Sequence, residues 1–472
     1  MAACGARVGP YLGAAEGLGG AGAATNGTGT NGNAVSSGPT ANGGSQSGSQ
    51  PASQSSSGGG GAPQVPAAAS FGFTPQQEAS ACPGSAGNTA SAPGITPNAI
   101  QIGNVSGLSG PLSGSFPQGP QAVTALFDAV NAAGGICGRQ LQLTVEDDTQ
   151  NSSTNQTDVQ NLINKPVFAF AGSTSDADNG GVPAMQQANI PDFGFAIACA
   201  RSESSTYWSV DGGSCYQPPG SSSYEIGDGT PLLAQTSGYL PKKMAFLAYS
   251  IPISAQAAQE FAYVYQHTFG GTVCYSDYSI SPVSASLESD VEQMRANGCE
   301  GVFTTLDITG NAKMLQAMQQ QNFTMGYVAT TFDGYTPQQI STAGESAAQG
   351  LLVSLPFIPL NENQPMDTMY KQQLAQYVPN SQPSGFGFLA WLAGQMMIYA
   401  LLQAGRNPTR ASVVGVLNGL QNYTAGGAVG PHAPSNHGWA TCQVDVTVKG
   451  NDFVRKAPAS GLFCGGTEVP AS

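Results

Sequence analysis

The alternation of short apolar strands with amphipathic helices constrains the fold more than any other feature of this sequence. Ile100 and Ile102 alternate in a strand that ends at Gly103. The next segment repeats apolar residues at i, i+3, i+4 and i+7, namely Val123, Leu126, Phe127 and Val130, which predicts one buried helical face ended by Gly134-Gly135. Leu141, Leu143 and Val145 then alternate in a second strand. The order predicts a βαβ unit.

The same pattern recurs down the chain. Strands are predicted at 166–171, 190–198, 244–248, 272–275, 301–305 and 327–331, and helices at 255–268, 288–296 and 311–321. A further helix is expected to begin at the Ser/Thr loop after Gly172. Strands that alternate with helices are typical of parallel sheets covered on both faces. Two such blocks predict an α/β protein of two doubly wound parallel-sheet lobes.

The range 386–405 has no charged residue and is long enough to cross a bilayer. Gln395 and Gln403 interrupt it, and it lies among α/β segments. We therefore predict a buried helix of the protein core.

The N-terminal part differs in composition. No charged residue occurs from Gly17 to Gln77, where Gly, Ser, Ala, Asn, Thr, Gln and Pro dominate. Such a stretch buries too little apolar surface to offset its chain entropy, so a disordered stalk is expected. The opening Met-Ala-Ala-Cys4-Gly5 is typical of the end of a bacterial lipoprotein signal, which makes Cys4 the candidate for lipidation and membrane anchoring. The upstream parts of such a signal are missing, so the start is misplaced or trimmed, and a chance cysteine is the alternative.

Charge and cysteine content exclude several functions. The net charge is -14 with only 14 Lys and Arg and no basic run, so we expect no nucleic-acid partner. Nine cysteines without a C-x-x-C pair, and three histidines, argue against a metal site. Disulfides in an oxidising compartment are expected instead, with buried free thiols as the alternative. From proximity in the sequence we pair Cys199 with Cys215, Cys442 with Cys464 across a C-terminal hairpin, Cys274 with Cys299, and Cys82 with Cys137.

No catalytic motif is complete. The segment 344–348 begins like a nucleophile elbow but lacks the closing glycine, and neither H-E-x-x-H nor a Walker loop occurs. A G-x-G-x-x-G match at 17–22 lies in low-complexity sequence with no strand before it. We expect no enzymatic activity and no cofactor.

Several spaced motifs carry a family resemblance. They are Ser109-Gly110-Pro111, Asn131, the run 134–139, Asp147-Asp148 after the second strand, the segment 343–353, and Pro383-Ser384-Gly385-Phe386. Over about residues 94 to 456 the chain resembles the branched-chain amino-acid-binding (Leu/Ile/Val-binding) protein family, the type I periplasmic solute-binding proteins of ABC transporters.

The resemblance implies two lobes joined by a three-stranded hinge, with crossings near Tyr216, Val353 and Gly430. We expect lobe I at 94–216 with 354–430, lobe II at 217–353 with 431–472, and the lipoprotein N-terminus and stalk at 1–93. The function implied is an extracytoplasmic receptor, a monomer, that captures a small polar molecule and delivers it to an ABC transporter permease. A sensing domain of the same fold is the alternative, and N-x-S/T triplets leave a surface glycoprotein open.

The resemblance also suggests site residues. In the family a Ser/Thr-rich loop after the third strand and the loop after the fourth hold the ligand's carboxylate; the corresponding residues here are Ser173, Thr174, Ser175, Ala196 and Ala198. N-capping of a helix is the alternative for the first three. On lobe II the family uses a tyrosine and an acidic residue that meets the ligand's ammonium.

The candidates on lobe II are Asp307, Asp333 and Tyr335, with solvated loop side chains as the alternative. Ile253-Ser254 replaces the expected Tyr-Gly, and Tyr249 lies out of register. Because Ala198 and Ile253 depart from the family pattern, amino acids, small amides, ureas and organic acids all remain candidate ligands.

Overall fold

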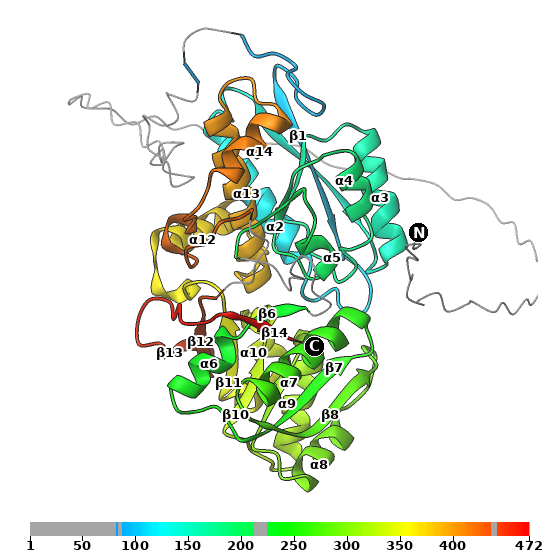
Figure 1. Ribbon diagram of the computed structural model, residues 1–472, viewed down its shortest axis with the longest axis vertical. Helices are drawn as coiled ribbons and strands as arrows, with labels where there is room; N and C mark the ends of the chain where they lie inside the picture. Colours follow the sequence, from blue (N-terminus) through cyan, green and yellow to red (C-terminus); the bar gives the residue numbers. More distant parts are fainter. Residues whose placement is uncertain (1–81, 84–86, 212–223, 436–440, 472) are drawn as a thin grey trace, which may run out of the picture. The chain divides into compact units, whose positions relative to one another are not determined.

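Two β-sheets organise the protein (Figure 1). The computed structural model describes residues 82–83, 87–211, 224–435 and 441–471, which fall within one compact unit. The first sheet has five parallel strands in the order β2-β1-β3-β4-β5. Its strands are β1 (Ala99–Ser106), β2 (Gln140–Asp147), β3 (Ala169–Ala171), β4 (Asp192–Gly194) and β5 (Tyr207–Ser209).

The second sheet has seven strands in the order β13-β12-β11-β10-β9-β7-β8. They are β7 (Lys243–Tyr249), β8 (Thr272–Ile280), β9 (Gly301–Thr304), β10 (Tyr327–Thr330), β11 (Leu351–Leu355), β12 (Val444–Lys449) and β13 (Asp452–Ala457). The sheet is parallel from β8 to β11, as predicted, and β12 and β13 add an antiparallel hairpin at the β11 edge. A short antiparallel ribbon pairs β6 (Glu225–Gly227) with β14 (Glu468–Pro470).

Helices cover both faces of the five-stranded sheet. The pair α2 (Gln118–Ala132) and α13 (Gly385–Ala404) packs on one face, and α3 (Ser152–Asn164) packs on β1 and β2 with α4 (Val182–Gln187) beside it. The predicted apolar stripe of α2 is buried. Outside this layer, α12 (Pro365–Tyr377) packs on α2, α14 (Arg410–Asn418) packs on α13, and α5 (Cys199–Ser202) follows β4.

The seven-stranded sheet is likewise sandwiched, as its alternating side chains require. On β7, Met244 and Phe246 join one apolar cluster, whereas Ala245 and Leu247 join another. The surrounding helices are α6 (Gly229–Thr236), α7 (Pro252–His267), α8 (Glu288–Ala296), α9 (Ile308–Gln320), α10 (Pro337–Ala343) and α11 (Glu345–Ala348). The described residues also form the short 3-10 turns η2 (Phe332–Gly334), η3 (Leu360–Glu362) and η4 (Ala425–Gly427).

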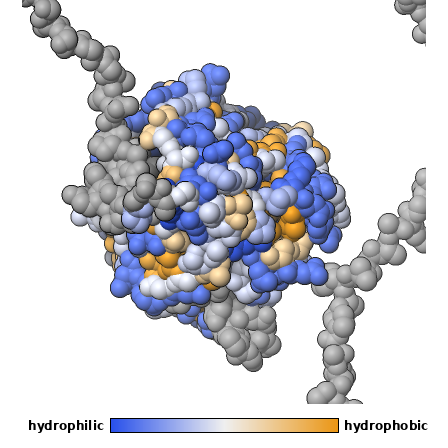
Figure 2. All heavy atoms as spheres, turned by 90° about the horizontal axis from the view of Figure 1, so that it is seen from above, coloured by the Kyte–Doolittle hydropathy of each residue, from blue (hydrophilic) through white to orange (hydrophobic). Residues whose placement is uncertain are grey.

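Helix α13 confirms the prediction made for residues 386–405. Among the described residues it is the one helix long and apolar enough to cross a membrane, yet 94% of its apolar stretch is buried inside the protein. Its Trp391 is fully buried and donates to the Gln373 side chain at 2.7 Å. Seen from above, apolar areas of the molecular surface are interspersed among hydrophilic ones (Figure 2).

Sulfur atoms meet in three of the predicted pairs: Cys82 with Cys137, Cys274 with Cys299, and Cys442 with Cys464. Cys4, the uncharged stretch 17–77, Cys215 and the crossing expected near Tyr216 lie outside the described residues. The helix expected at the Ser/Thr loop is wrong in position. Residues 173–181 are loop and turn, and α4 begins only at Val182.

Candidate functional site

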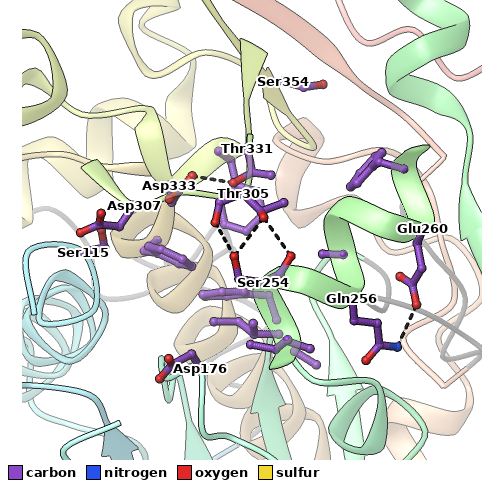
Figure 3. A pocket seen from close by; sticks show the side chains of 18 of the residues that line it. Ser115, Asp176, Ser254, Gln256, Glu260, Thr305, Asp307, Thr331, Asp333 and Ser354 are labelled. Atoms are coloured by element: carbon purple, nitrogen blue, oxygen red, sulfur yellow. Dashed lines mark hydrogen bonds between the residues drawn. The ribbon is translucent and has the colours of Figure 1, made fainter. Parts of the chain in front are cut away.

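A cavity of about 210 Å³ lies where loops from both sheets meet (Figure 3). Its wall comes mainly from segments after the carboxyl ends of parallel strands: β1, β3, β4 and β5 of one sheet, and β7, β9, β10 and β11 of the other. Open α/β sheets place ligands at this edge, because the loops there present side chains and backbone groups that no strand uses. The fold therefore puts this cavity where a ligand site is expected.

Four phenylalanine rings form an aromatic wall of the cavity. Phe386 of α13 lies with its ring centroid 5.3 Å from that of Phe116, 5.2 Å from that of Phe195 and 5.3 Å from that of Phe332. Phe195 and Phe332 meet edge to face at 5.7 Å. The four rings come from four separate segments, so only the folded chain assembles them.

Asp307 lines the cavity and begins α9. Its Oδ1 accepts from the Gly310 backbone N–H at 2.8 Å, which is an N-cap, and from the Tyr249 hydroxyl. Burial, and then the Asp307 charge, raise the pKa of Tyr249 above its ordinary value, so the hydroxyl remains a donor. The other oxygen of Asp307, Oδ2, is buried and has no partner among the described residues. The residue is only 6% exposed.

Asp333, in η2, also lines the cavity. Its Oδ1 accepts from the Thr331 hydroxyl at 2.5 Å and from the Gly334 N–H at 2.9 Å. Burial raises the pKa of Asp333 to about 7, and the nearby Asp307 adds to that rise. Two acids predicted from the sequence are thus brought together in one wall.

Ser254 lines the cavity at a position where the family resemblance predicts part of a Tyr-Gly pair. Its hydroxyl accepts from the Tyr249 N–H at 3.1 Å and donates to the Thr305 carbonyl at 3.0 Å. Ile253 and Tyr249 also line the cavity. Tyr249, out of register in the sequence, is therefore the tyrosine that the tertiary structure brings to the site.

Three more carboxyl groups line the cavity, Asp176, Asp211 and Glu260, and sequence reasoning missed all three. Burial raises the pKa of each to about 7, and for Asp176 the charges of Asp148 and Asp178 contribute. Glu260 is held by the Gln256 amide at 2.8 Å. In the view of Figure 3, Asp176, Asp307 and Asp333 lie on one side of the pocket and Glu260 on the other.

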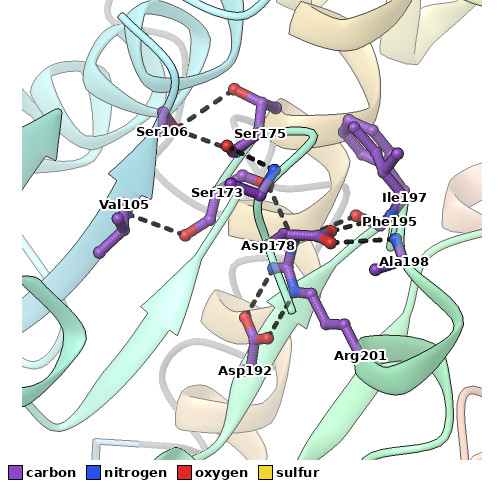
Figure 4. A network of polar contacts seen from close by, with 12 residues as sticks. Val105, Ser106, Ser173, Ser175, Asp178, Asp192, Phe195, Ile197, Ala198 and Arg201 are labelled. Carbon is purple, nitrogen blue, oxygen red and sulfur yellow. Dashed lines mark hydrogen bonds and ion pairs between the residues drawn. The ribbon is translucent and has the colours of Figure 1, made fainter. Parts of the chain in front are cut away.

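The Ser/Thr loop serves the protein's own structure (Figure 4). Ser173 Oγ accepts from the Val105 N–H at 3.1 Å, Thr174 Oγ1 donates to the Phe116 carbonyl at 2.7 Å, and Ser175 Oγ accepts from the Ala177 N–H at 3.0 Å. All three are buried, and none is among the residues that line the cavity. The N-cap alternative also fails for them, since no helix begins there.

The same loop, residues 173–181, carries an internal carboxylate, Asp178. Asp178 accepts from the backbone N–H groups of Ile197 and Ala198 at 2.9 and 3.0 Å. It also pairs with Arg201 at 3.2 Å, and Arg201 binds both oxygens of Asp192 at 2.8 and 2.9 Å. Burial alone would lower the pKa of Arg201, but Asp192 and then Asp178 raise it. Figure 4 shows this network beside Phe195, Ile197 and Ala198.

Of the other predicted site residues Ala196, Ala198 and Tyr335, only Ala196 lines the cavity. Ala196 lines the cavity, whereas Ala198 does not, and its N–H is bound to Asp178. Tyr335 is 5% exposed, packs with its ring tilted against Phe357 and Phe453 in the core, and its oxygen accepts from the Leu360 N–H at 2.9 Å. The sequence did hold a clue to Asp176 and Asp178, because both follow the Ser/Thr loop directly.

Fold and cavity together define a two-sheet α/β protein of the type I ligand-binding architecture. The chain belongs to the periplasmic binding protein family, whose model matches residues 99–449. Membership of this family implies an extracytoplasmic location. A search of curated proteins found no match.

Solved structures share the fold at low identity. A branched-chain amino acid ABC transporter protein from Thermus thermophilus with bound valine is 18% identical, with a TM-score of 0.65, covering 78% of this chain and 97% of its own. A fatty acid ABC transporter substrate-binding protein from Thermomonospora curvata is 15% identical, with a TM-score of 0.64 and coverage of 80% and 93%. A Streptococcus pneumoniae branched-chain amino acid transporter substrate binding protein in complex with isoleucine is 15% identical, with a TM-score of 0.62 and coverage of 76% and 100%.

Proposed function

We propose that this protein is an extracytoplasmic solute-binding receptor that captures a small polar ligand in the cavity and delivers it to an ABC transporter permease. The observation that carries the proposal is a cavity at the carboxyl ends of strands from both sheets, in a chain of the periplasmic binding protein family. We propose Ala196, Asp307 and Asp333 as ligand contacts, together with Tyr249 and Ser254.

The domain arrangement and the membrane attachment are part of the same proposal. Lobe I comprises 94–216 with 354–430, and lobe II comprises 217–353 with 431–472, so that closure of the two lobes buries the ligand. A lipid on Cys4 and the uncharged stretch 17–77 would tether a monomeric receptor to the membrane. Intact mass of detergent-extracted protein tests the tether, since Cys4→Ser abolishes the added lipid mass.

Isothermal titration of ligand-stripped protein tests ligand capture. The full chain is unfolded in urea without reductant, dialysed and refolded, then titrated with amino acids, amides, ureas, organic acids and amines. We expect saturable heat with one class and about 10- to 100-fold weaker binding by Asp307→Asn, which removes a charge but keeps an N-cap acceptor. Absence of heat with every class would contradict the receptor function.

The response of the membrane partner distinguishes a transport function from a sensing function. Stimulation of ligand uptake by the cognate permease in proteoliposomes supports delivery. Ligand binding without any stimulation of uptake, but with a change in the activity of a membrane kinase or cyclase, would favour the sensing alternative.

A further inference from the structure

The described wall of the cavity is rich in acidic side chains. Asp176, Asp211, Glu260, Asp307 and Asp333 line it, and no Lys, Arg or His is among the described residues of its wall. The segment 212–223, which follows Asp211, contains no basic residue in its sequence either. Clefts lined by one sign of charge attract ligands of the opposite sign. An anionic ligand would find no compensating cation among the described residues of this wall.

The backbone donors of the loop after β4 are already occupied. The Ile197 and Ala198 N–H groups bind both oxygens of Asp178, and Arg201 neutralises that charge from behind. Arg201 and Asp178 are 1% and 3% exposed. A ligand carboxylate would have to displace this buried ion pair, and breaking such a pair is strongly unfavourable. Asp178 therefore occupies the backbone N–H groups to which a ligand carboxylate would otherwise bind.

Acceptors, in contrast, are left open. Asp307 Oδ2 and Asp176 Oδ1 are buried in the cavity wall with no partner among the described residues, and Asp307 is 6% exposed. Buried polar atoms are nearly always hydrogen-bonded in native proteins. A bound N–H donor with a positive charge would satisfy these carboxylate oxygens and form the strongest kind of hydrogen bond.

The aromatic wall defines the rest of the ligand. The rings of Phe116, Phe195, Phe332 and Phe386 line the cavity together with the aliphatic side chains of Ile251 and Ile253. Aromatic faces attract organic cations, and their area buries an apolar body. Asp333 lies in the same η2 turn as Phe332. The nearby charge of Asp307 contributes to the raised pKa of Asp333.

We propose that the ligand is a protonated organic amine with an apolar body and no carboxylate group, its ammonium bound at Asp307 and Asp333. This inference rests on the proposed receptor function and narrows its ligand. It sets the protein apart from an amino-acid receptor, in which one site must serve an ammonium and a carboxylate together.

Matched ligands test the inference. Isoamylamine and phenethylamine are compared with leucine and phenylalanine, which add a carboxylate to the same bodies, and with 4-methylpentanamide and 4-methylpentanoate. Titration of the refolded full chain near neutral pH is expected to show an amine binding at least about tenfold more tightly than its amino acid.

Substitutions of the two acidic residues test where the ammonium group of the ligand binds. Asp307→Asn and Asp333→Asn are each expected to weaken amine binding about 10- to 100-fold, because each removes a charged acceptor. Glu292→Gln on the exposed face of α8 is the matched control and should leave amine affinity unchanged. Circular dichroism and the unfolding midpoint verify that each variant is folded.

Each outcome decides a question. An amino acid or 4-methylpentanoate that binds as tightly as its amine would overturn the inference and leave the receptor function standing. Binding of the amide alone would do the same. A lack of response to any amine overturns the inference, and if amino acids, amides, ureas and organic acids are silent as well, the receptor function fails with it.

Discussion

At the residue scale, buried charge is the distinguishing property of this protein. Arg201 is fully enclosed, with Asp178 and Asp192 as its ion-pair partners. A buried pair gains little over an apolar replacement of both partners, but removing one partner leaves an uncompensated charge. The network holds the Phe195–Ala198 loop against the cavity through the two backbone N–H groups bound to Asp178.

Replacing Arg201 by methionine should therefore destabilise the protein strongly. We expect Arg201→Met to lower the free energy of unfolding by about 3–5 kcal/mol, measured by urea denaturation without reductant. Lys165→Met is the control, because the Lys165–Glu146 pair is exposed and should contribute only about 0–1 kcal/mol. Similar losses for the two variants would contradict the role assigned to Arg201.

At the element scale, the start of α13 is fitted to the turn that carries Phe332 and Asp333. The Gly385 N–H donates to the Tyr335 carbonyl at 3.0 Å, and a Cβ added at Gly385 would lie 2.2 Å from the Phe332 carbonyl oxygen. The Ser384 side chain caps the helix by accepting from the Gly387 N–H at 3.0 Å. The close approach at Gly385 thus helps to join α13 to the cavity wall.

Gly385→Ala should consequently harm both stability and ligand binding, although alanine favours helix. We expect a loss of about 1–3 kcal/mol, since the Phe332 backbone must shift to admit a methyl group. Gly415→Ala in α14 is the matched change, because its Cβ meets nothing within 4 Å, and should be neutral or stabilising by up to about 1 kcal/mol. Equal effects of both substitutions in denaturation and titration would show that the contact is unimportant.

At the scale of the whole molecule, raised carboxyl pKa values make stability depend on pH. Asp176, Asp211, Glu260 and Asp333 each have a pKa of about 7 in the folded chain. In the unfolded chain such groups ionise near pH 4. The folded state therefore binds more protons between these values, and the free energy of unfolding falls as pH rises from about 4 to about 7.

Ligand-free protein should accordingly be more stable near pH 5 than near pH 8, by more than about 1 kcal/mol. Glu260→Gln removes one of these groups and is expected to flatten the dependence, whereas Glu292→Gln, on exposed α8, should not. Chemical denaturation across this pH range measures the difference. A stability that rises with pH for the unaltered chain would contradict the proposed titration.

Covalent cross-links act on the whole chain as well. Non-reducing peptide mapping should recover Cys82 with Cys137, Cys274 with Cys299 and Cys442 with Cys464, and we predict Cys199 with Cys215 as the fourth pair. Reduction should lower the free energy of unfolding by about 2–4 kcal/mol per bond, because each bond restricts the unfolded chain. Alkylation of these cysteines before reduction would disprove the pairing.

The sequence by itself determined the strongly periodic elements, because helix and strand periodicity is a local property. The strand at Ile100, the helix through Val123 and Val130 and the buried helix of residues 386–405 all follow from which residues repeat at which spacing. It also identified Asp307 and Asp333, which follow directly after predicted strands and line the cavity. Their role in ligand binding remains a prediction.

Only the tertiary structure decided what surrounds the ligand space. The sequence predicts that the Ser/Thr loop faces a ligand, but Arg201, packed from a later segment, pairs with Asp178 of that loop and closes the region into an internal network. The aromatic wall and the additional acids Asp176, Asp211 and Glu260 come from distant segments. Burial, the position of neighbouring charges and the pairing of backbone N–H groups depend on long-range contacts, and no local pattern encodes them.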